Sequence, residues 1–372
     1  MQFRDLQRQY EALHPQIDTA MKKVSASGSF IMGRCVEELE ERLARYVGVK
    51  HCVTCGNGTD ALYLALRVWG VGAGDAVFVP DFTFFATAEV VSLVGATPVF
   101  VDVDPNTFNL SPVDLEAKIA NCSLNPKAVI AVDLFGQPAD YHAIRNMVRK
   151  NHMLLLEDGA QGFGGSIDGK RACSFGDIAT TSFFPAKPLG CYGDGGALFT
   201  DNDEWAEMAS SLRLHGRGTN KYSNERIGIN SRLDALQAAI LQVKLDAFEQ
   251  NELSAVQKVA EKYNHLLQEV VTIPVMPSWV ASSWAQYTIR LADAGQRDGL
   301  RDALKKSGIP SQVYYPCPLH LLPAFSSLPL SVDACPNAQS LSQTVLSLPI
   351  HPYLRDDEVE RVAMAVKSYI YG

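Results

Sequence analysis

The chain has 372 residues, of which 47% are hydrophobic and 20% are charged. This balance, with no low-complexity run, excludes a disordered or fibrous protein and predicts a globular chain with one large or two unequal domains. The formal net charge is -8 and no Lys/Arg cluster stands out, so the sequence offers no positively charged region of the kind that binds nucleic acid. No apolar stretch reaches the roughly 20 residues that span a bilayer, and the first residues lack the apolar core of a secretory signal. We therefore expect a soluble protein of the cytoplasm, with neither nucleic acid nor membrane as a partner.

Apolar residues recur at helical spacing in two N-terminal segments, which end at Gly28 and Gly48. From there to about residue 200, short apolar runs alternate with helical stretches, which predicts a mainly parallel α/β sheet. The last two strands follow each other without a helix, so part of the sheet is expected to be mixed. The predicted strands are 51–54, 76–79, 98–103, 128–132, 152–156, 178–182 and 197–200, with helices at 59–69, 84–94, 112–121 and 139–150.

A long helical run from Arg232 to about Glu269 leads to Pro274 and Pro277, which indicates a domain junction. We expect a large α/β domain of residues 1–250, which includes the N-terminal helices, and a small C-terminal α+β domain of residues 251–372. The small domain is predicted to contain strands at 286–291 and 311–314 and helices at 297–307, 336–346 and 356–370.

The eight cysteines are scattered without the spacing of a disulfide framework, so we expect reduced thiols. Cys52 and Cys55 form a C-x-x-C pattern, but no second pair and no histidine cluster completes a metal site. Buried fillers on a strand are the alternative interpretation of this pair. The sequence predicts no bound metal.

Lys187 carries the most specific chemical signal. It lies five residues past Ser182, after an apolar strand and before a glycine-rich bend. At the edge of a sheet its amine can be partly desolvated, which lowers the amine pKa as a Schiff-base lysine requires. A surface lysine beside a turn is the alternative, and the neighbouring pattern argues against it.

Asp158 is expected at the carboxyl end of a buried strand, where ligands of open α/β sheets bind. A carboxylate there can hold a pyridine nitrogen protonated, which makes the ring an electron sink. A helix N-cap is an equally good interpretation from the residues alone. Gln161 can hydrogen-bond a ring hydroxyl, or it is an ordinary loop amide.

Gly58 and Thr59 lie in the segment Gly56-Asn-Gly-Thr-Asp, between a predicted strand and an amphipathic helix. Glycines at a helix start let backbone N–H groups approach a phosphate, and the helix dipole favours its charge. The segment matches no standard phosphate-loop motif, and a capped turn is the alternative. Phe84, after the next strand, can stack on a planar ring or belong to the core.

These segments, in this order, resemble the DegT/DnrJ/EryC1/StrS sugar aminotransferase family, within fold type I of the pyridoxal-phosphate enzymes, the aspartate aminotransferase fold. The resemblance covers nearly the whole chain and is most specific at 56–62, 157–161, 182–197 and 228–239. It implies a large, mostly parallel mixed sheet with a small C-terminal α+β domain. It also implies that Lys187 forms the Schiff base and acts as general acid and base.

The resemblance assigns further roles at matching positions. Asp158 would pair with the pyridine nitrogen, Gln161 with the ring hydroxyl, and Phe84 would stack on the ring. The phosphate of pyridoxal phosphate would be held by Gly58, Thr59 and Ser182. Asn230 would reach the phosphate of the neighbouring subunit's cofactor, which implies a homodimer with shared active sites; without the resemblance, Asn230 is better interpreted as a loop-to-helix cap.

The segments 182–196 and 347–354 are similar to those of the 3-aminotransferases that aminate UDP-2-acetamido-2-deoxy-3-oxo-glucuronate, with L-glutamate as donor, in bacterial O-antigen assembly. This similarity implies a nucleotide-linked 3-keto sugar as substrate. Substrate contacts are expected from Arg232, whose guanidinium suits a carboxylate or phosphate, and from the Pro-flanked loop. The loop residues chosen as contacts are Tyr314, Tyr315 and His320.

His215 and Arg217 are predicted to form a lid or a second anion contact, with a solvated loop as the alternative. Relatives often have His-Tyr-Pro where this chain has Tyr314-Tyr315-Pro316, so a 4-keto substrate stays open. A sugar dehydratase would have a histidine in place of Lys187. A non-catalytic protein that binds pyridoxal phosphate for regulation is the alternative from a different class.

Overall fold

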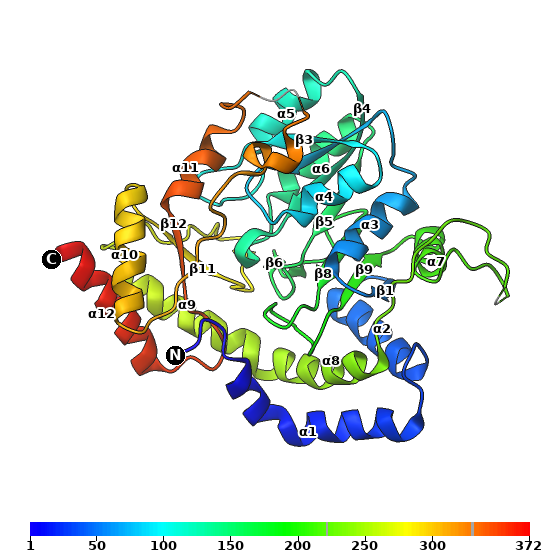
Figure 1. Ribbon diagram of the computed structural model, residues 1–372, viewed down its shortest axis with the longest axis horizontal. Coiled ribbons are helices and arrows are strands. Elements are labelled where there is room, and N and C mark those ends of the chain that lie inside the picture. The colour runs from blue at the N-terminus through cyan, green and yellow to red at the C-terminus, as the bar shows by residue number, and fades with distance from the viewer. Residues whose placement is uncertain (221, 329–330) are drawn as a thin grey trace.

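The computed structural model describes residues 1–220, 222–328 and 331–372. In Figure 1 a central sheet with helices on both faces occupies the middle of the molecule, and the C-terminal elements form a second group beside it. The two groups are joined by a long helical segment along one edge. This arrangement is the α/β architecture that the sequence predicted.

The main sheet has strand order β1-β9-β8-β5-β4-β2-β3 among the described residues. Neighbouring strands are parallel except at β9, which is antiparallel to both β1 and β8. The predicted mixed character at this end of the sheet is therefore confirmed. The strands are β1 His51–Cys55, β2 Asp75–Pro80, β3 Thr97–Val101, β4 Asn125–Val132, β5 Leu154–Asp158, β8 Ile178–Ser182 and β9 Gly196–Thr200.

The strands are apolar and buried on both faces, because helices cover both sides of the sheet. Side chains of α3, α4 and α7 share one core with alternate strand residues, while α2, α5, α6 and α8 cover the opposite face. Helix α1 lies along α8. These helices are α1 Leu6–Ser27, α2 Arg34–Val47, α3 Gly58–Val68, α4 Ala86–Leu93, α5 Pro112–Ala120, α6 Tyr141–Lys150, α7 Asp203–Leu212 and α8 Ala235–Ala247.

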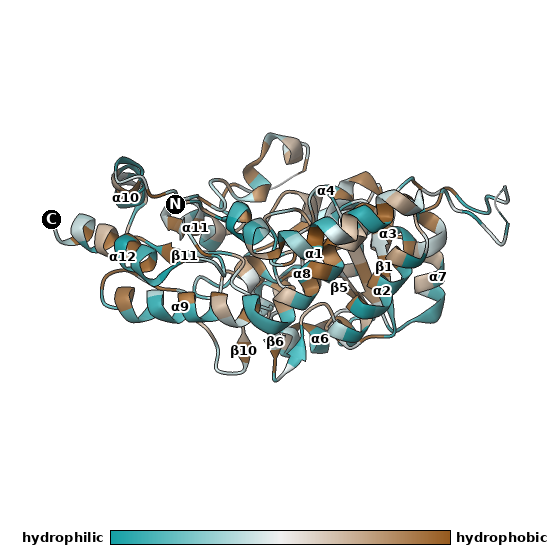
Figure 2. Ribbon diagram, turned by 90° about the horizontal axis from the view of Figure 1, so that it is seen from below, coloured by the Kyte–Doolittle hydropathy of each residue, from teal (hydrophilic) through white to brown (hydrophobic). Residues whose placement is uncertain are grey.

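The C-terminal part has a two-stranded antiparallel sheet of β11 and β12 packed against helices α9, α10 and α12. Figure 2 shows hydrophobic strands in the interior and helices of mixed character around them. None of the described helices combines the length and apolar character needed to cross a membrane. The elements are α9 Leu253–Leu267, β11 Tyr287–Arg290, α10 Ala294–Lys306, α11 Pro336–Thr344, β12 Val345–Leu348 and α12 Asp356–Tyr371.

In the C-terminal half one predicted strand is wrong, and the bounds of two predicted helical segments differ from the structure. The helical run predicted from Arg232 begins at Ala235 instead, and a π-helical turn, Phe248–Glu252, interrupts it. The segment 311–314 is not a strand: only Gln312 forms an isolated bridge, since prolines on both sides remove backbone donors. The helix predicted to reach residue 346 ends at Thr344, where β12 begins. The proposed domain boundary after residue 250 lies within the π-helical turn and stays a prediction.

Shorter elements connect these parts. Within the described ranges, three short strands form a separate antiparallel sheet and three 3₁₀ turns lie in connecting loops. The loop between α7 and α8 extends away from the body of the molecule in both views (Figures 1 and 2). The short elements are β6 Ser166–Ile167, β7 Lys170–Arg171, β10 Val280–Ala281, η1 Leu134–Gly136, η3 Leu319–Leu321 and η4 Pro323–Phe325.

Candidate active site

Several predicted residues meet at one edge of the main sheet. Strands β1, β2, β4, β5 and β8 all run toward this edge, and β9 starts there because it runs in the opposite direction. Asp158 is the last residue of β5, Ser182 is the last residue of β8, and Gly58 follows β1. The carboxyl ends of parallel strands are the usual place for a ligand in such a sheet.

Lys187 lies in the loop that joins β8 to β9. Its backbone N–H donates to the carbonyl of Phe184 (2.9 Å), and Cys191 N–H donates to the carbonyl of Phe183 (2.8 Å), which closes the loop tightly. The side chain is partly buried, and burial lowers the pKa of the Lys187 amine. The negative charge of Asp158 opposes this shift, while the positive charge of Arg4 adds to it. The site therefore favours the neutral amine more than water does, as a nucleophilic lysine requires.

Asp158 is buried opposite the lysine loop. Its carboxylate accepts hydrogen bonds from Thr87 Oγ1 (2.9 Å) and from the backbone N–H of Ala160 (3.2 Å). Burial raises the pKa of Asp158, and both hydrogen bonds and the charge of Lys187 oppose that shift. Thr87, in α4, was missed by sequence reasoning, because nothing in its local pattern points to a partner 71 residues away. A carboxylate held in this way can keep a ring nitrogen protonated.

Gln161 is fixed from two sides. Its Oε1 accepts a hydrogen bond from the N–H of Phe135 (2.8 Å), and its Nε2 donates to the hydroxyl of Tyr315 (3.1 Å). Burial raises the pKa of Tyr315, so its hydroxyl stays protonated at neutral pH. The ring of Tyr315 lies 6.4 Å from that of Phe84, whose surface is 55% exposed. Phe84 therefore offers an open aromatic face beside the two fixed polar groups.

A cradle for an anion forms where α3 begins. The side chain of Asn57 caps the helix by accepting from Asp60 N–H (2.8 Å), and the N–H groups of Gly58 and Thr59 have no acceptor inside the helix. A Cβ on Gly58 would lie 2.7 Å from the Cβ of Ser182, and one on Gly196 would overlap the carbonyl of Asn57. Only glycine lets these segments approach so closely. Free N–H groups and the Ser182 hydroxyl suit a phosphate.

Asn230 and Arg232 lie next to this cradle. Between them, Ser231 accepts a hydrogen bond from Gly56 N–H (2.9 Å) and donates to Asp60 Oδ2 (2.6 Å). The side chain of Asn230 is exposed and that of Arg232 is partly buried. His215 and Arg217 are exposed on the loop between α7 and α8 that extends from the body, and their predicted role as a lid stays a prediction.

The prediction that His320 contacts the substrate has no support in this geometry. His320 is buried, with Nδ1 2.5 Å from Asp81 Oδ2 and Nε2 3.0 Å from the carbonyl of Val332. Its backbone N–H also donates to Asp81 Oδ1 (2.8 Å). Both ring nitrogens are thus engaged, and His320 ties the loop that carries Tyr314 and Tyr315 to the end of β2.

Tyr314 and Tyr315 are joined by a cis peptide bond and face different neighbours. Tyr315 contacts Gln161 and Phe84, as described above, whereas the ring of Tyr314 meets the edge of Phe3 at 6.2 Å. Of these two predicted substrate contacts, Tyr315 therefore lies beside Gln161 and Tyr314 lies beside the N-terminal segment.

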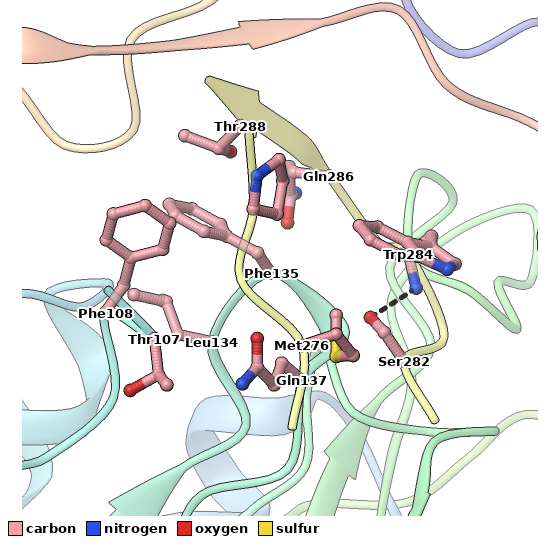
Figure 3. Close-up of a pocket in the computed structure, with 11 residues that line it drawn as sticks. Thr107, Phe108, Leu134, Phe135, Gln137, Met276, Ser282, Trp284, Gln286 and Thr288 are labelled. Atoms are coloured by element: carbon pink, nitrogen blue, oxygen red, sulfur yellow. Dashed lines mark hydrogen bonds between the residues drawn. The ribbon is translucent and has the colours of Figure 1, made fainter. Parts of the chain in front are cut away.

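A small cavity lies between the turn η1 and the segment that leads to β11 (Figure 3). Its lining includes neither Lys187 nor Asp158. The amide oxygen of Gln286 faces this buried region without a hydrogen-bond partner among the described residues. The lining residues are Thr107, Phe108, Leu134, Phe135, Gln137, Pro274, Met276, Ser282, Trp284, Gln286 and Thr288.

Residues 12–367 match the DegT/DnrJ/EryC1/StrS aminotransferase family. The chain belongs to this family. It is 44% identical to the UDP-2-acetamido-2-deoxy-3-oxo-D-glucuronate aminotransferase of Pseudomonas aeruginosa over 99% of this chain and 100% of that protein. The crystal structure of a DegT DnrJ EryC1 StrS aminotransferase from Brucella abortus superposes with a TM-score of 0.96 at 45% identity, covering 100% of both chains. NtdA of Bacillus subtilis, solved with bound pyridoxamine phosphate (PMP), gives 0.87 at 27% identity over 97% of this chain and 82% of that one.

These findings confirm the predicted family, the fold and the enzyme class. The chain is an aminotransferase with the fold of its family, and its cofactor is pyridoxal phosphate, or pyridoxamine phosphate in the aminated form. The residues at the sheet edge fit that group: a partly buried lysine, a buried acid, a fixed amide, an open aromatic face and a cradle of free N–H groups. The individual residue roles stay predictions, because they rest on this fit and on the resemblance.

Proposed function

We propose that this enzyme transfers the amino group of L-glutamate to a nucleotide-linked keto sugar. We further propose UDP-2-acetamido-2-deoxy-3-oxo-D-glucuronate as the sugar, made for bacterial surface polysaccharide. The observation that carries the proposal of amino transfer is that Lys187, in the loop after β8, and the buried Asp158, at the end of β5, lie at the same sheet edge as the Gly58 cradle and influence each other's charge. The choice of sugar is supported by the relative of that name, which is 44% identical over its full length.

When bound, pyridoxal phosphate supplies an electron sink that stabilises negative charge on the substrate carbon. The N–H groups of Gly58 and Thr59 bind the phosphate and thereby fix the position of the ring. Asp158 keeps a proton on the ring nitrogen. Gln161 holds the ring hydroxyl, since its amide is already oriented by Phe135 and Tyr315.

Lys187 moves the proton in both half-reactions. Its lowered pKa raises the fraction of neutral amine, so Nζ can take the proton from Cα of glutamate as a general base. The resulting ammonium would give this proton to the cofactor carbon that bears the transferred amino group. In the second half-reaction Nζ would take a proton back from that carbon and deliver it to the carbon that carried the keto oxygen of the sugar. The donor and the acceptor use the same site in turn, which gives ping-pong kinetics.

A shared dimeric site is part of the proposal. The side chain of Asn230 is exposed, and large apolar side chains surround the segment that carries it. Phe30 is 47% exposed, Ile31 is 48% exposed and Ile227 is 80% exposed, and the backbone of 30–31 contacts residues 234–235. Apolar surface of this kind is typical of an interface. We propose that a second copy covers it and that Asn230 reaches the partner's phosphate.

The proposal is tested by following the two half-reactions. Borohydride should attach the cofactor to Lys187 in the wild-type protein, as located by peptide mass. The Lys187→Ala variant should lose amino transfer while it still binds the cofactor; transfer at the wild-type rate would refute the role of Lys187. The pyridoxamine form is then mixed with 3-keto and 4-keto nucleotide sugars. Conversion by a 4-keto sugar alone overturns the substrate, loss of water from the sugar indicates a dehydratase, and no turnover with any sugar indicates a regulatory protein.

A further inference from the structure

The segment before α1 contacts the loop of the catalytic lysine. Arg4 Nη2 donates to the backbone carbonyl of Lys187 (2.8 Å) and to that of Pro188 (3.3 Å), across more than 180 residues of sequence. The neighbouring residue Phe3 meets the ring edge of Tyr314. The N-terminal segment therefore touches both the lysine loop and the loop predicted to bind the sugar.

The lysine loop needs such a donor. It contains Pro185 and Pro188, which have no N–H groups, and the N–H of Lys187 itself is used inside the turn. The carbonyls of Lys187 and Pro188 therefore accept from outside the loop. Both bonds come from Nη2, whose two N–H groups lie in the fixed plane of the guanidinium, whereas a lysine ammonium on its flexible stem has no such fixed direction.

Arg4 also brings a permanent charge. Burial lowers the pKa of Arg4 to about 10, with Glu252 opposing, so the side chain stays cationic at neutral pH. This charge faces the Lys187 amine from the N-terminal segment, and Asp158 faces the amine from β5 with the opposite sign. Other titratable groups that interact with Arg4 are Lys244 in α8, Glu252 in the π-helical turn and the buried His351.

The segment is held in place by residues other than Arg4. Arg8, in the first turn of α1, forms two hydrogen bonds with Glu358 at the start of α12 (2.7 and 2.8 Å). Gln9 donates to Glu252 (2.9 Å), which also accepts from Tyr353 (2.7 Å). Arg8 thus anchors the same segment with a cation of the same kind, but without contact to the lysine loop.

We propose that Arg4 is a positioning residue for Lys187, which holds the backbone of the lysine loop and keeps a fixed positive charge near the amine. The proposal rests on the role of Lys187 given above. Arg4 lies outside the segments that carry the family resemblance, so its role is inferred from this structure alone.

The experiment compares the holoenzymes of Arg4→Met, Arg4→Lys and the control Arg8→Met. The visible absorbance of the bound cofactor is titrated with pH, because its midpoint reports the protonation of the lysine–cofactor nitrogen. Loss of a nearby positive charge favours the protonated form, so the midpoint should move to higher pH in Arg4→Met and stay in place in Arg8→Met. Amino transfer by Arg4→Met should fall about tenfold or more, since misplacement of a reacting group by about 1 Å costs up to 10²-fold.

Arg4→Lys separates the two parts of the proposal. It keeps the charge but not the planar N–H groups of Nη2, so its midpoint should remain near that of wild type while its rate falls several-fold. An unchanged midpoint in Arg4→Met, or an equal shift in Arg8→Met, would overturn the role of the charge. If Arg4→Met does not fold, the test rests on Arg4→Lys: amino transfer by this variant at the wild-type rate would overturn the positioning role of Arg4. Borohydride mapping of the wild-type protein comes first, because attachment elsewhere than Lys187 refutes the proposed function instead.

Discussion

The Gly58→Ala variant tests whether the start of α3 is the phosphate cradle. The new Cβ would lie 2.7 Å from Ser182 Cβ and 3.2 Å from its hydroxyl oxygen. Carbon atoms in contact normally lie about 3.5–4.0 Å apart, so β8 and α3 have to separate by about 1 Å. Overpacking of this size costs about 1–3 kcal/mol.

The higher helix propensity of alanine opposes the cost of this clash. Alanine favours a helix over glycine by about 0.8–1.0 kcal/mol in a helix interior, and less is expected at the first helical position. The clash therefore prevails, and the shift separates the Ser182 hydroxyl from the N–H groups of Gly58 and Thr59. If the whole cost falls on the bound state, cofactor affinity drops about 5-fold to 150-fold, at 1.4 kcal/mol per factor of ten.

The assay is titration of the cofactor-free protein with pyridoxal phosphate, followed by visible absorbance. Gly72→Ala is a matched control, because its Cβ would meet only the carbonyl of Val94 at an ordinary 3.7 Å. Thermal unfolding of both cofactor-free variants checks that each has folded. Wild-type affinity in Gly58→Ala, with the fold intact, would show that the phosphate binds elsewhere.

Three further predictions concern the surroundings of the site. Asp158→Asn keeps the shape and the acceptor for Thr87 but removes the charge, so the glutamate half-reaction should slow about 10²- to 10³-fold in single-turnover measurements; a wild-type rate would contradict the role of the acid. His320→Ala removes the side-chain hydrogen bond to the buried Asp81 and leaves only the backbone N–H of residue 320 as its donor from this loop, so urea unfolding should show a loss of about 1–3 kcal/mol that the double variant with Asp81→Ala partly recovers; full additivity would refute the pair. Arg8 lowers the pKa of Glu358 to about 2, so this pair stabilises the fold above the unfolded-state pKa near 4.5 and loses its effect as pH falls toward 2. The stability difference between wild type and Arg8→Met should shrink over that range, and a difference independent of pH would exclude the ion pair as its cause.

The sequence predicted well where the signal is local. The strand that ends at Asp158 and the glycine-rich bend after Lys187 both follow from residues within a few positions. The sheet edge then brings them together, because parallel strands end on the same side. Thr87 and Arg4 escaped prediction because their partners lie 71 and 183 residues away, and no short pattern encodes such a contact.

The burial of His320 escaped sequence reasoning for a related reason, and its predicted substrate contact stays a prediction. A histidine in a Pro-flanked loop is typical of an exposed polar tip, and its partner Asp81 is 239 residues away, at the end of β2. The strand 345–348 was missed because the segment before it has helical spacing, and only pairing with β11 makes Val345 extended. In both cases a tertiary contact overrides the local preference.

The contacts of Tyr314 and Tyr315 suggest how one loop can serve two purposes. Tyr315 is hydrogen-bonded to Gln161, so a change there would disturb the amide that we propose to hold the ring hydroxyl of the cofactor. The ring of Tyr314 contacts Phe3, in the N-terminal segment, and the ring of Tyr315. Among the described ring contacts, Tyr314 makes none with the residues that we propose to bind the cofactor. The residue at position 314 can therefore vary while the hydrogen bond between Tyr315 and Gln161 is kept. Position 314 is where this chain departs from the His-Tyr-Pro pattern. His320 holds the same loop on Asp81, and a substitution at position 314 leaves this anchor in place.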